Sequence, residues 1–205
     1  MAEAVIQFHS GGVKVQPPLS LYIHLPWSVR KCPYCDFNSH AAQALPEAAY
    51  IDALLADLER ALPDIWGRRI HTVFFGGGTP SLFSADGIDR ILTGVRMLTP
   101  LLPGAEITLE ANPGTVEAAR FAGFRAAGVT RISLGIQSFN PRHLQALGRI
   151  HDDSEARRAA ELAATHFDTY NLDLMYALPG QTLAEALADI DTALMFQPPH
   201  LSAYH

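Results

Sequence analysis

Residues 22–37 read Tyr-Ile-His-Leu-Pro-Trp-Ser-Val-Arg-Lys-Cys-Pro-Tyr-Cys-Asp-Phe, a short apolar run followed by a loop that carries both cysteines of the chain. Cys32 and Cys35 are separated by two residues, a spacing that suits metal binding or redox chemistry better than a structural disulfide. Ser28 stands four positions before Cys32. A cysteine there would complete the C-x3-C-x2-C spacing of an iron–sulfur loop, and the serine leaves only two soft ligands.

The cysteine pair taken alone is compatible with two other kinds of site. Cys-Pro-Tyr-Cys is also the redox motif of glutaredoxins, in which a thiolate of low pKa attacks disulfides. With His24 and His40 nearby, Cys32 and Cys35 could instead hold a zinc ion. The length of the chain and the motifs that follow favour the iron–sulfur interpretation over both alternatives.

Length, composition and charge limit the classes of protein to which the chain can belong. A chain of 205 residues with 48% hydrophobic residues is long enough for one sizeable α/β domain. The net charge of −6, without runs of Lys and Arg, argues against nucleic acid as a partner. The first residues lack the basic and apolar segments of a secretion signal, and no apolar run could span a bilayer, so we expect a cytoplasmic protein.

Short apolar runs alternate with segments of helical spacing from Leu19 onward. The apolar runs predict six buried strands, at 20–25, 70–75, 105–109, 130–135, 169–175 and 200–204. A segment with helical periodicity follows each of the first five strands. This alternation predicts a parallel sheet, and the lack of a nucleotide-binding Gly-x-Gly-x-x-Gly motif favours a curved open barrel over a doubly wound sheet.

Capping residues mark several helix boundaries. Thr182 and Glu185 have the spacing of a capping box, in which the two side chains satisfy backbone N–H groups at the start of a helix. Gly128 and the pair at 198–199, Pro-Pro, mark the ends of two helices.

The stretch 22–37 resembles the cluster loop of radical SAM proteins, specifically the family of oxygen-independent coproporphyrinogen III oxidases and HemW-like heme chaperones. Tyr22, His24 and Pro26 match the family's Tyr-x-His-x-Pro, and Phe37 matches the aromatic residue after the last cysteine. Oxidases of this family usually carry a further cysteine at the position of Phe37, so the resemblance favours the chaperones.

The resemblance also implies the architecture, a (β/α)6 partial TIM-like barrel of the radical SAM type. We expect residues 20–205 to form this barrel, truncated after its sixth strand. Residues 1–19 are expected to form an irregular leader. Family members continue with a C-terminal domain that is absent here, so we interpret the chain as a fragment.

The family binds a [4Fe–4S] cluster, S-adenosylmethionine (SAM) and heme, and its open iron chelates the amino and carboxylate groups of SAM. The resemblance therefore implies that Cys32 and Cys35 are metal ligands, with Ser28 at the position of the missing third cysteine. The family's heme-linked segment lies beyond residue 205. Heme and heme-acceptor proteins are the implied partners of the full-length family, and a membrane-associated acceptor and a homodimer are further expectations.

Polar and glycine-rich segments follow several predicted strands. The segment 76–80, Gly-Gly-Gly-Thr-Pro, follows the second strand, and Glu110, Gln137 and Asp173 lie at or near the ends of three others. The carboxyl ends of parallel strands meet at one mouth of a barrel, where α/β sites gather. By resemblance, the residues that hold SAM are Tyr22, Tyr34, Gly77, Gly78, Thr79, Glu110, Gln137, Arg149 and Asp173, with the Arg149 guanidinium suited to a carboxylate.

Each of these residues also has an ordinary structural interpretation. The glycine run could be only a tight turn, Glu110 could cap the next helix, and the other polar residues could be surface groups or ion-pair partners. His24 is expected to point toward the cluster loop, although a packed core histidine is an alternative. The remaining histidines show no metal-ligand spacing and are expected to be surface or satisfied polar residues; these include His143, His151 and His166.

The sequence thus predicts the radical SAM domain of a heme chaperone whose cluster loop is impaired by Ser28. The alternative is an oxygen-independent coproporphyrinogen III oxidase, an enzyme that decarboxylates propionate side chains. Two origins of Ser28 also stay open, an engineered replacement of cysteine and a natural loss, and the otherwise intact loop favours a deliberate or recent replacement.

Overall fold

The computed structural model describes residues 17–41, 44–115 and 118–205. The expected leader at 1–19 therefore lies almost entirely outside the described residues. The helices and strands are β1 (Leu19–Leu25), β2 (Trp27–Ser28), β3 (His40–Ala41), α1 (Glu47–Ile65), β4 (Ile70–Gly77), α2 (Ala85–Leu98), β5 (Leu101–Ala111), α3 (Ala118–Ala127), β6 (Arg131–Gln137), α4 (Pro141–Ala146), α5 (Asp153–His166), β7 (Thr169–Met175), α6 (Leu183–Met195) and β8 (His200–Tyr204), with 3-10 turns η1 (Pro80–Leu82) and η2 (Pro113–Thr115).

Six parallel strands form one sheet in the order β1-β4-β5-β6-β7-β8. All six predicted strands are confirmed. The largest boundary error is in β5, which begins at Leu101 rather than at 105. Pro103 and Gly104 interrupt the apolar pattern, yet Leu101 already pairs with Ile70, and a register shift after Ile70 absorbs the interruption.

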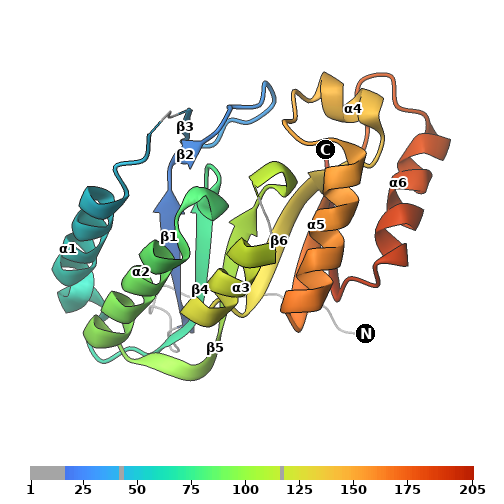
Figure 1. The fold of residues 1–205 in the computed structure, drawn as a ribbon. Coiled ribbons are helices and arrows are strands. Elements are labelled where there is room, and N and C mark those ends of the chain that lie inside the picture. Colours follow the sequence, from blue (N-terminus) through green and yellow to red (C-terminus); the bar gives the residue numbers. More distant parts are fainter. Residues whose placement is uncertain (1–16, 42–43, 116–117) are drawn as a thin grey trace, which may run out of the picture.

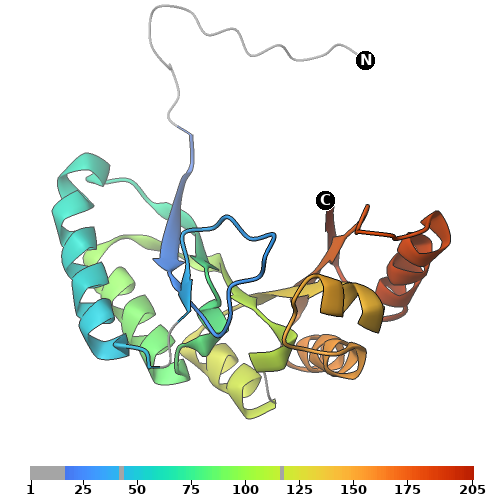
Figure 2. The same cartoon turned by 90° about the horizontal axis from the view of Figure 1, so that it is seen from above.

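The sheet is curved, and its helices cover one face. From above, β1 to β8 follow an arc with α1, α2, α3, α5 and α6 on its outer side (Figure 2). The strands point toward the end where the loop after β1 lies, at the top of Figure 1. This arrangement is the expected partial barrel, with an open inner face and strand ends gathered at one mouth.

Alternation along the strands separates an apolar outer face from a polar inner face. In β6, Ile132, Leu134 and Ile136 are buried in the core that the helices close. Ser133, on the opposite face, lines a cavity on the inner side of the sheet together with Asp173 of β7. Successive side chains of a strand point to opposite faces, so each strand contributes both to the core and to the inner face.

The predicted helix boundaries are confirmed. The Thr182–Glu185 capping box is present at the start of α6, and Gly128 follows α3 with a φ of 105°. In the described part of the chain, no helix is long and apolar enough to cross a membrane.

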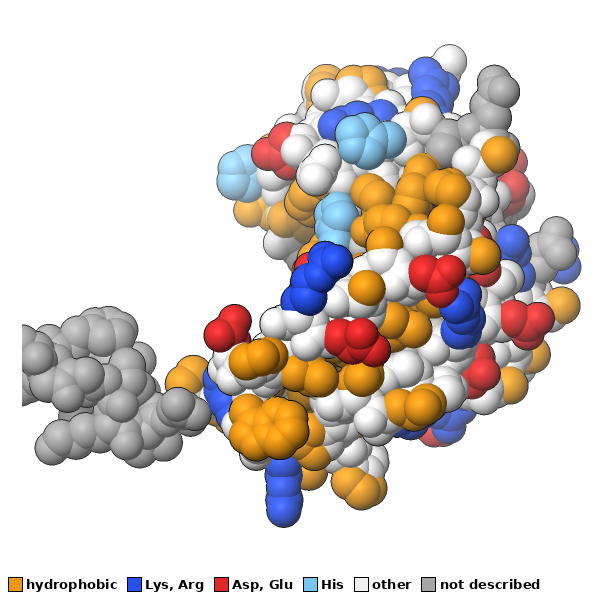
Figure 3. Space-filling view, turned by 90° about the vertical axis from the view of Figure 1, so that its left-hand side faces the viewer, with side chains coloured by type: hydrophobic (Ala, Val, Ile, Leu, Met, Phe, Trp, Pro, Cys, Tyr) orange, Lys and Arg blue, Asp and Glu red, His pale blue; other side chains and the backbone are white. Residues whose placement is uncertain are grey.

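Apolar side chains remain exposed on α6. They are Leu183, Leu187, Leu194 and Met195. On the opposite side of the molecule, the face that carries α1 shows hydrophobic side chains interspersed with charged ones (Figure 3).

Candidate functional site

A cavity open to solvent lies on the inner face at the carboxyl ends of the strands, with an empty volume of about 750 Å³ that includes its open mouth. Its walls come from the loop after β1 and from the ends of β4 to β8. The lining residues include Ser28, Cys32, Tyr34, Cys35, Gly77, Gly78, Thr79, Glu110, Gln137, Arg149 and Asp173. The cavity thus brings together every predicted site residue except Tyr22.

The loop after β1 is folded back over the cavity by backbone and side-chain hydrogen bonds. The His40 N–H donates to the Pro26 carbonyl at 2.7 Å, and the two short strands β2 and β3 pair beside it. His24 Nε2 lies 2.8 Å from the Asn38 carbonyl oxygen. The expectation that His24 points toward this loop is therefore confirmed, and the loop is tied to β1 at both of its ends.

The zinc alternative is not supported. The ring nitrogens of His24 face the Tyr22 hydroxyl and the Asn38 carbonyl. His40 is exposed. Across the residues that the structure describes, no three His, Cys, Asp or Glu side chains are grouped closely enough to hold a metal ion.

The glycine turn after β4 is packed against the backbone of the loop. Gly78 N–H donates to the Leu25 carbonyl at 2.9 Å, and Thr79 N–H donates to the Trp27 carbonyl at 2.7 Å. A Cβ at Gly78 would lie 2.4 Å from the Trp27 oxygen and 2.7 Å from Ser28 Oγ. The absence of a side chain at Gly78 is therefore what lets the loop that carries Ser28 approach the sheet, in addition to leaving space for a ligand.

Two carboxylates line the cavity, Glu110 of β5 and Asp173 of β7, two strands that β6 separates in the sheet. Burial, followed by the charge of Asp173, raises the pKa of Glu110 from 4.5 to about 7, opposed by the nearby Gly77 N–H. Burial also raises the pKa of Asp173, against hydrogen bonds from Asn171 and Ser133. At the 3-10 turn η2 it is Asn112, not Glu110, that accepts the Gly114 N–H. The start of α3 lies next to residues outside the described part of the chain, so the alternative that Glu110 caps that helix stays open. Paired buried carboxylates form a site that favours a cationic or hydroxyl-bearing ligand.

The raised pKa of Glu110 predicts that its charge destabilises the fold. The folded state holds the proton more tightly than the unfolded chain, so stability falls as pH rises from about 4.5 to about 7. We expect Glu110→Gln to be more stable than the parent by about 1–3 kcal/mol near pH 8, with the difference lost near pH 4.5. Urea unfolding at the two pH values measures this.

Glu106→Gln is the matched control, since Glu106 is an exposed glutamate of the same strand. It should show no comparable gain at high pH. A Glu110→Gln variant with no advantage over the parent at the higher pH would show that Glu110 is not a buried ionised group.

Arg149 joins the cysteine loop to the sheet. Its Nη2 donates to the Gly135 carbonyl at 2.7 Å, and its Nη1 lies 3.3 Å from the Tyr34 hydroxyl and 3.8 Å from Cys32 Sγ. Its buried Nε has no hydrogen-bond partner. A guanidinium with a free donor at the wall of a cavity is suited to an anionic group of a ligand.

His151 lies next to this guanidinium and is buried. It contacts the Asn112 side chain and the Ile136 carbonyl, each at 3.1 Å. Burial, followed by the charge of Arg149, lowers the pKa of His151 to about 4. The prediction of a satisfied polar histidine is thus correct for His151. It is wrong for His143, which is 1% exposed and has no hydrogen bond at either ring nitrogen; its nearest polar partner is Glu185 Oε2, 3.6 Å from its Nε2.

Tyr204 is a cavity residue that sequence reasoning missed. Its hydroxyl donates to Gln137 Oε1 at 2.5 Å, and burial, followed by the charge of Asp173, raises its pKa. The only available signal was its place at the end of the sixth strand. Tyr22, by contrast, does not line the cavity; it is 56% exposed and packs over Gly76 and Phe74.

The donor set fits SAM but not a three-thiolate cluster. Arg149 offers an unpartnered N–H for a carboxylate, and Glu110 and Asp173 offer acceptors for an amino group or ribose hydroxyls. At the head of the loop only Cys32 and Cys35 supply thiols, since position 28 presents a hydroxyl.

A sequence model described as the radical SAM superfamily matches residues 22–193. The chain belongs to the radical SAM superfamily. Among radical SAM structures it resembles that of the coproporphyrinogen III oxidase HemN from Escherichia coli, with a TM-score of 0.83 and 29% identity over 91% of this chain and 44% of that one.

Among curated radical SAM relatives, the chain is 55% identical to the heme chaperone HemW of Escherichia coli over 190 residues, which are 92% of this chain and 50% of that protein. The heme chaperone HemW of Haemophilus influenzae is 55% identical over 194 residues, 92% of this chain and 51% of that protein. The chain therefore spans about half the length of the curated relatives that it matches.

Proposed function

We propose that this chain is the SAM-binding part of a cytoplasmic heme chaperone of the HemW type, with heme and heme-acceptor proteins as partners of the whole protein. The observation that supports the proposal most strongly is the cavity, because it collects carboxylates, a guanidinium and a glycine turn from seven separate segments, a set that suits a zwitterionic nucleoside ligand. The 55% identity to HemW supports the choice of a chaperone.

Each part of SAM has a proposed partner in the cavity. The Arg149 guanidinium would bind the carboxylate of the methionine end, since Arg149 lines the cavity and its charge is complementary to a carboxylate. Glu110 and Asp173 would accept from the amino group and the ribose hydroxyls. Gln137, Tyr34, Thr79 and the glycine turn would form the remaining walls, and Tyr22 would contribute from beside Gly76. Burial of these groups strengthens each hydrogen bond with the ligand.

The second candidate is the oxidase. The structural likeness to HemN, with a TM-score of 0.83, is the observation that keeps it open. Against it stands Phe37, which occupies the position where the oxidases of this family usually have a further cysteine.

A hybrid protein would separate the two functions. In the hybrid, this chain with Ser28→Cys replaces the matching 190-residue segment of Escherichia coli HemW. We expect the hybrid to bind heme at about one per chain and to pass it to a heme-free acceptor, soluble or in membranes, without decarboxylating coproporphyrinogen III under anaerobic conditions. Absorption spectra of donor and acceptor, and product analysis, report the two activities. Decarboxylation without heme transfer would favour the oxidase over the heme chaperone.

A further inference from the structure

Gln137, at the end of β6, has an unusual backbone conformation. Its φ of 69° lies in the left-handed region that residues other than glycine rarely adopt. The strand pairing is irregular at the same point, because Leu134 pairs with Leu172 and Gln137 pairs with Leu174. Between these two pairs the chain advances by three residues in β6 but by two in β7. Such a bulge re-aims the side chain that follows it. Leu174 points into the helix-covered core, whereas Gln137 lines the cavity.

A strained backbone persists only where its surroundings hold it. On its cavity side, Gln137 is held through its side chain, whose Oε1 accepts the Tyr204 hydroxyl at 2.5 Å. On its other side, the chain turns through Ser138 and Phe139, which are buried at 0% and 6% exposure, before α4 begins. The contacts of these two residues therefore decide whether the turn can relax.

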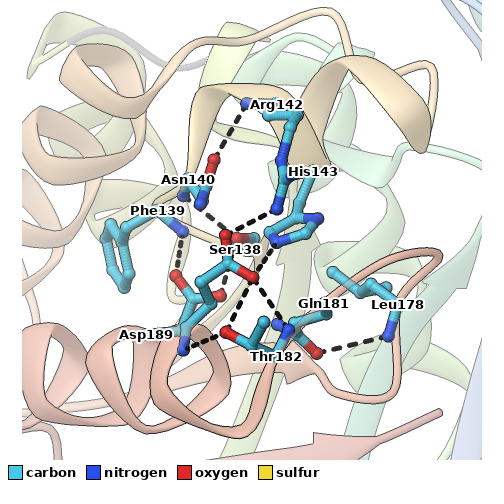
Figure 4. Close-up of polar contacts among 10 residues, drawn as sticks. Ser138, Phe139, Asn140, Arg142, His143, Leu178, Gln181, Thr182 and Asp189 are labelled. Atoms are coloured by element: carbon cyan, nitrogen blue, oxygen red, sulfur yellow. Dashed lines mark hydrogen bonds and ion pairs between the residues drawn. The ribbon is translucent and has the colours of Figure 1, made fainter.

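One carboxylate, Asp189 of α6, accepts a hydrogen bond from each of the two residues (Figure 4). The other polar contacts of Ser138 are local, because its N–H donates to the Ile136 carbonyl and its Oγ accepts the Asn140 N–H. The Ser138 hydroxyl donates to Asp189 Oδ2 and the Phe139 N–H donates to Asp189 Oδ1, each at 2.7 Å. Asp189 is only 4% exposed and does not line the cavity. A buried carboxylate whose two oxygens accept from two consecutive residues fixes the path of that segment tightly.

We infer that Asp189 is a positioning residue for ligand binding. By holding residues 138 and 139, it keeps Gln137 in the conformation that presents its amide group to SAM. The inference rests on the proposed function, because it takes SAM as the ligand of the cavity. The competing explanation is that Asp189 only ties α6 to the barrel, which would affect stability and leave the ligand unaffected.

A double-mutant cycle distinguishes these explanations. The variants are Asp189→Ala, Gln137→Ala and the pair together, with Asp189→Asn as a milder variant that keeps the side-chain shape and one acceptor oxygen. SAM affinity is measured by equilibrium dialysis, on the chain with Ser28 and on its anaerobically reconstituted Ser28→Cys form, at a temperature where circular dichroism shows each variant folded. We expect Asp189→Ala to weaken SAM binding about tenfold and Asp189→Asn to do so by less.

The decisive result is the coupling between the two positions. If Asp189 acts through Gln137, Asp189→Ala should weaken binding little or not at all once Gln137 is already alanine. Asp191→Ala, an exposed aspartate of the same helix, should leave the affinity unchanged.

Two other outcomes have separate meanings. Equal SAM affinity in the parent and both Asp189 variants, or an undiminished effect of Asp189→Ala in the Gln137→Ala background, would overturn the positioning role while leaving the proposed function intact. If neither the Ser28 chain nor its Ser28→Cys form binds SAM, the proposed function fails, and this inference fails with it.

Discussion

Ser28→Cys is expected to convert a chain that holds almost no iron into one that holds about four iron atoms after anaerobic reconstitution. Serine is a hard, weakly acidic ligand, and two thiolates are a poor set for a cubane cluster. The structure places position 28 on the cavity wall beside Cys32 and Cys35, so a third thiolate would face the same space. Because Gly78 has no side chain next to position 28, a sulfur atom can be accommodated there.

Iron and sulfide analysis measures the result, together with the visible absorption of the brown protein. Ser39→Cys is the matched control, because Ser39 is also a buried serine that lines the cavity. It adds a thiol to the same space at a position outside the C-x3-C-x2-C spacing, and it should not restore the cluster. Near-stoichiometric, air-stable cluster in the unmodified Ser28 chain would refute the prediction.

SAM affinity should rise with the cluster, by on the order of 100-fold in the reconstituted Ser28→Cys form. The reason is the number of attachment points. In the Ser28 chain only protein groups such as Glu110 and Arg149 hold the ligand, whereas an iron with an open position would hold its methionine end as well. Losing one of two linked attachments typically costs this much affinity.

Calorimetric titration of both forms with SAM tests this second prediction. The Ser28 chain should bind weakly but measurably, because its cavity groups are in place without iron. The Ser28→Cys protein before reconstitution is the control, and it should bind as weakly as the Ser28 chain. Equal affinity of the reconstituted and unreconstituted forms would mean that iron does not anchor the ligand.

The elements and their order could be predicted from the sequence, because the signals are local. Alternating apolar runs gave six strands at the correct places, and the Thr182–Glu185 spacing located the start of α6. The strand ends also indicated the site. Glu110, Gln137 and Asp173 belong to one cavity because the carboxyl ends of parallel strands meet at one edge of the sheet.

Other features depend on contacts between residues far apart in the chain. Tyr204 reaches Gln137 across 67 positions, and Arg149 reaches Cys32 across 117. Residue type and periodicity do not indicate which side chains at the strand ends contact one another. The histidines show the same limit, since His143 and His151 look alike in sequence but differ in their partners once buried.

The sequence by itself determined the alternation of strands and helices, the cysteine pair with its missing third member, and the polar residues at the strand ends. Each of these depends on neighbouring residues, whose periodicity reports which face of an element is buried. Only the tertiary structure decided that Gly78 makes room for the loop, that Glu110 titrates near neutral pH, and that Asp189 holds the turn behind Gln137. Those properties arise from burial and from distances between separate elements, which exist only after the sheet has curved and the helices have packed against it.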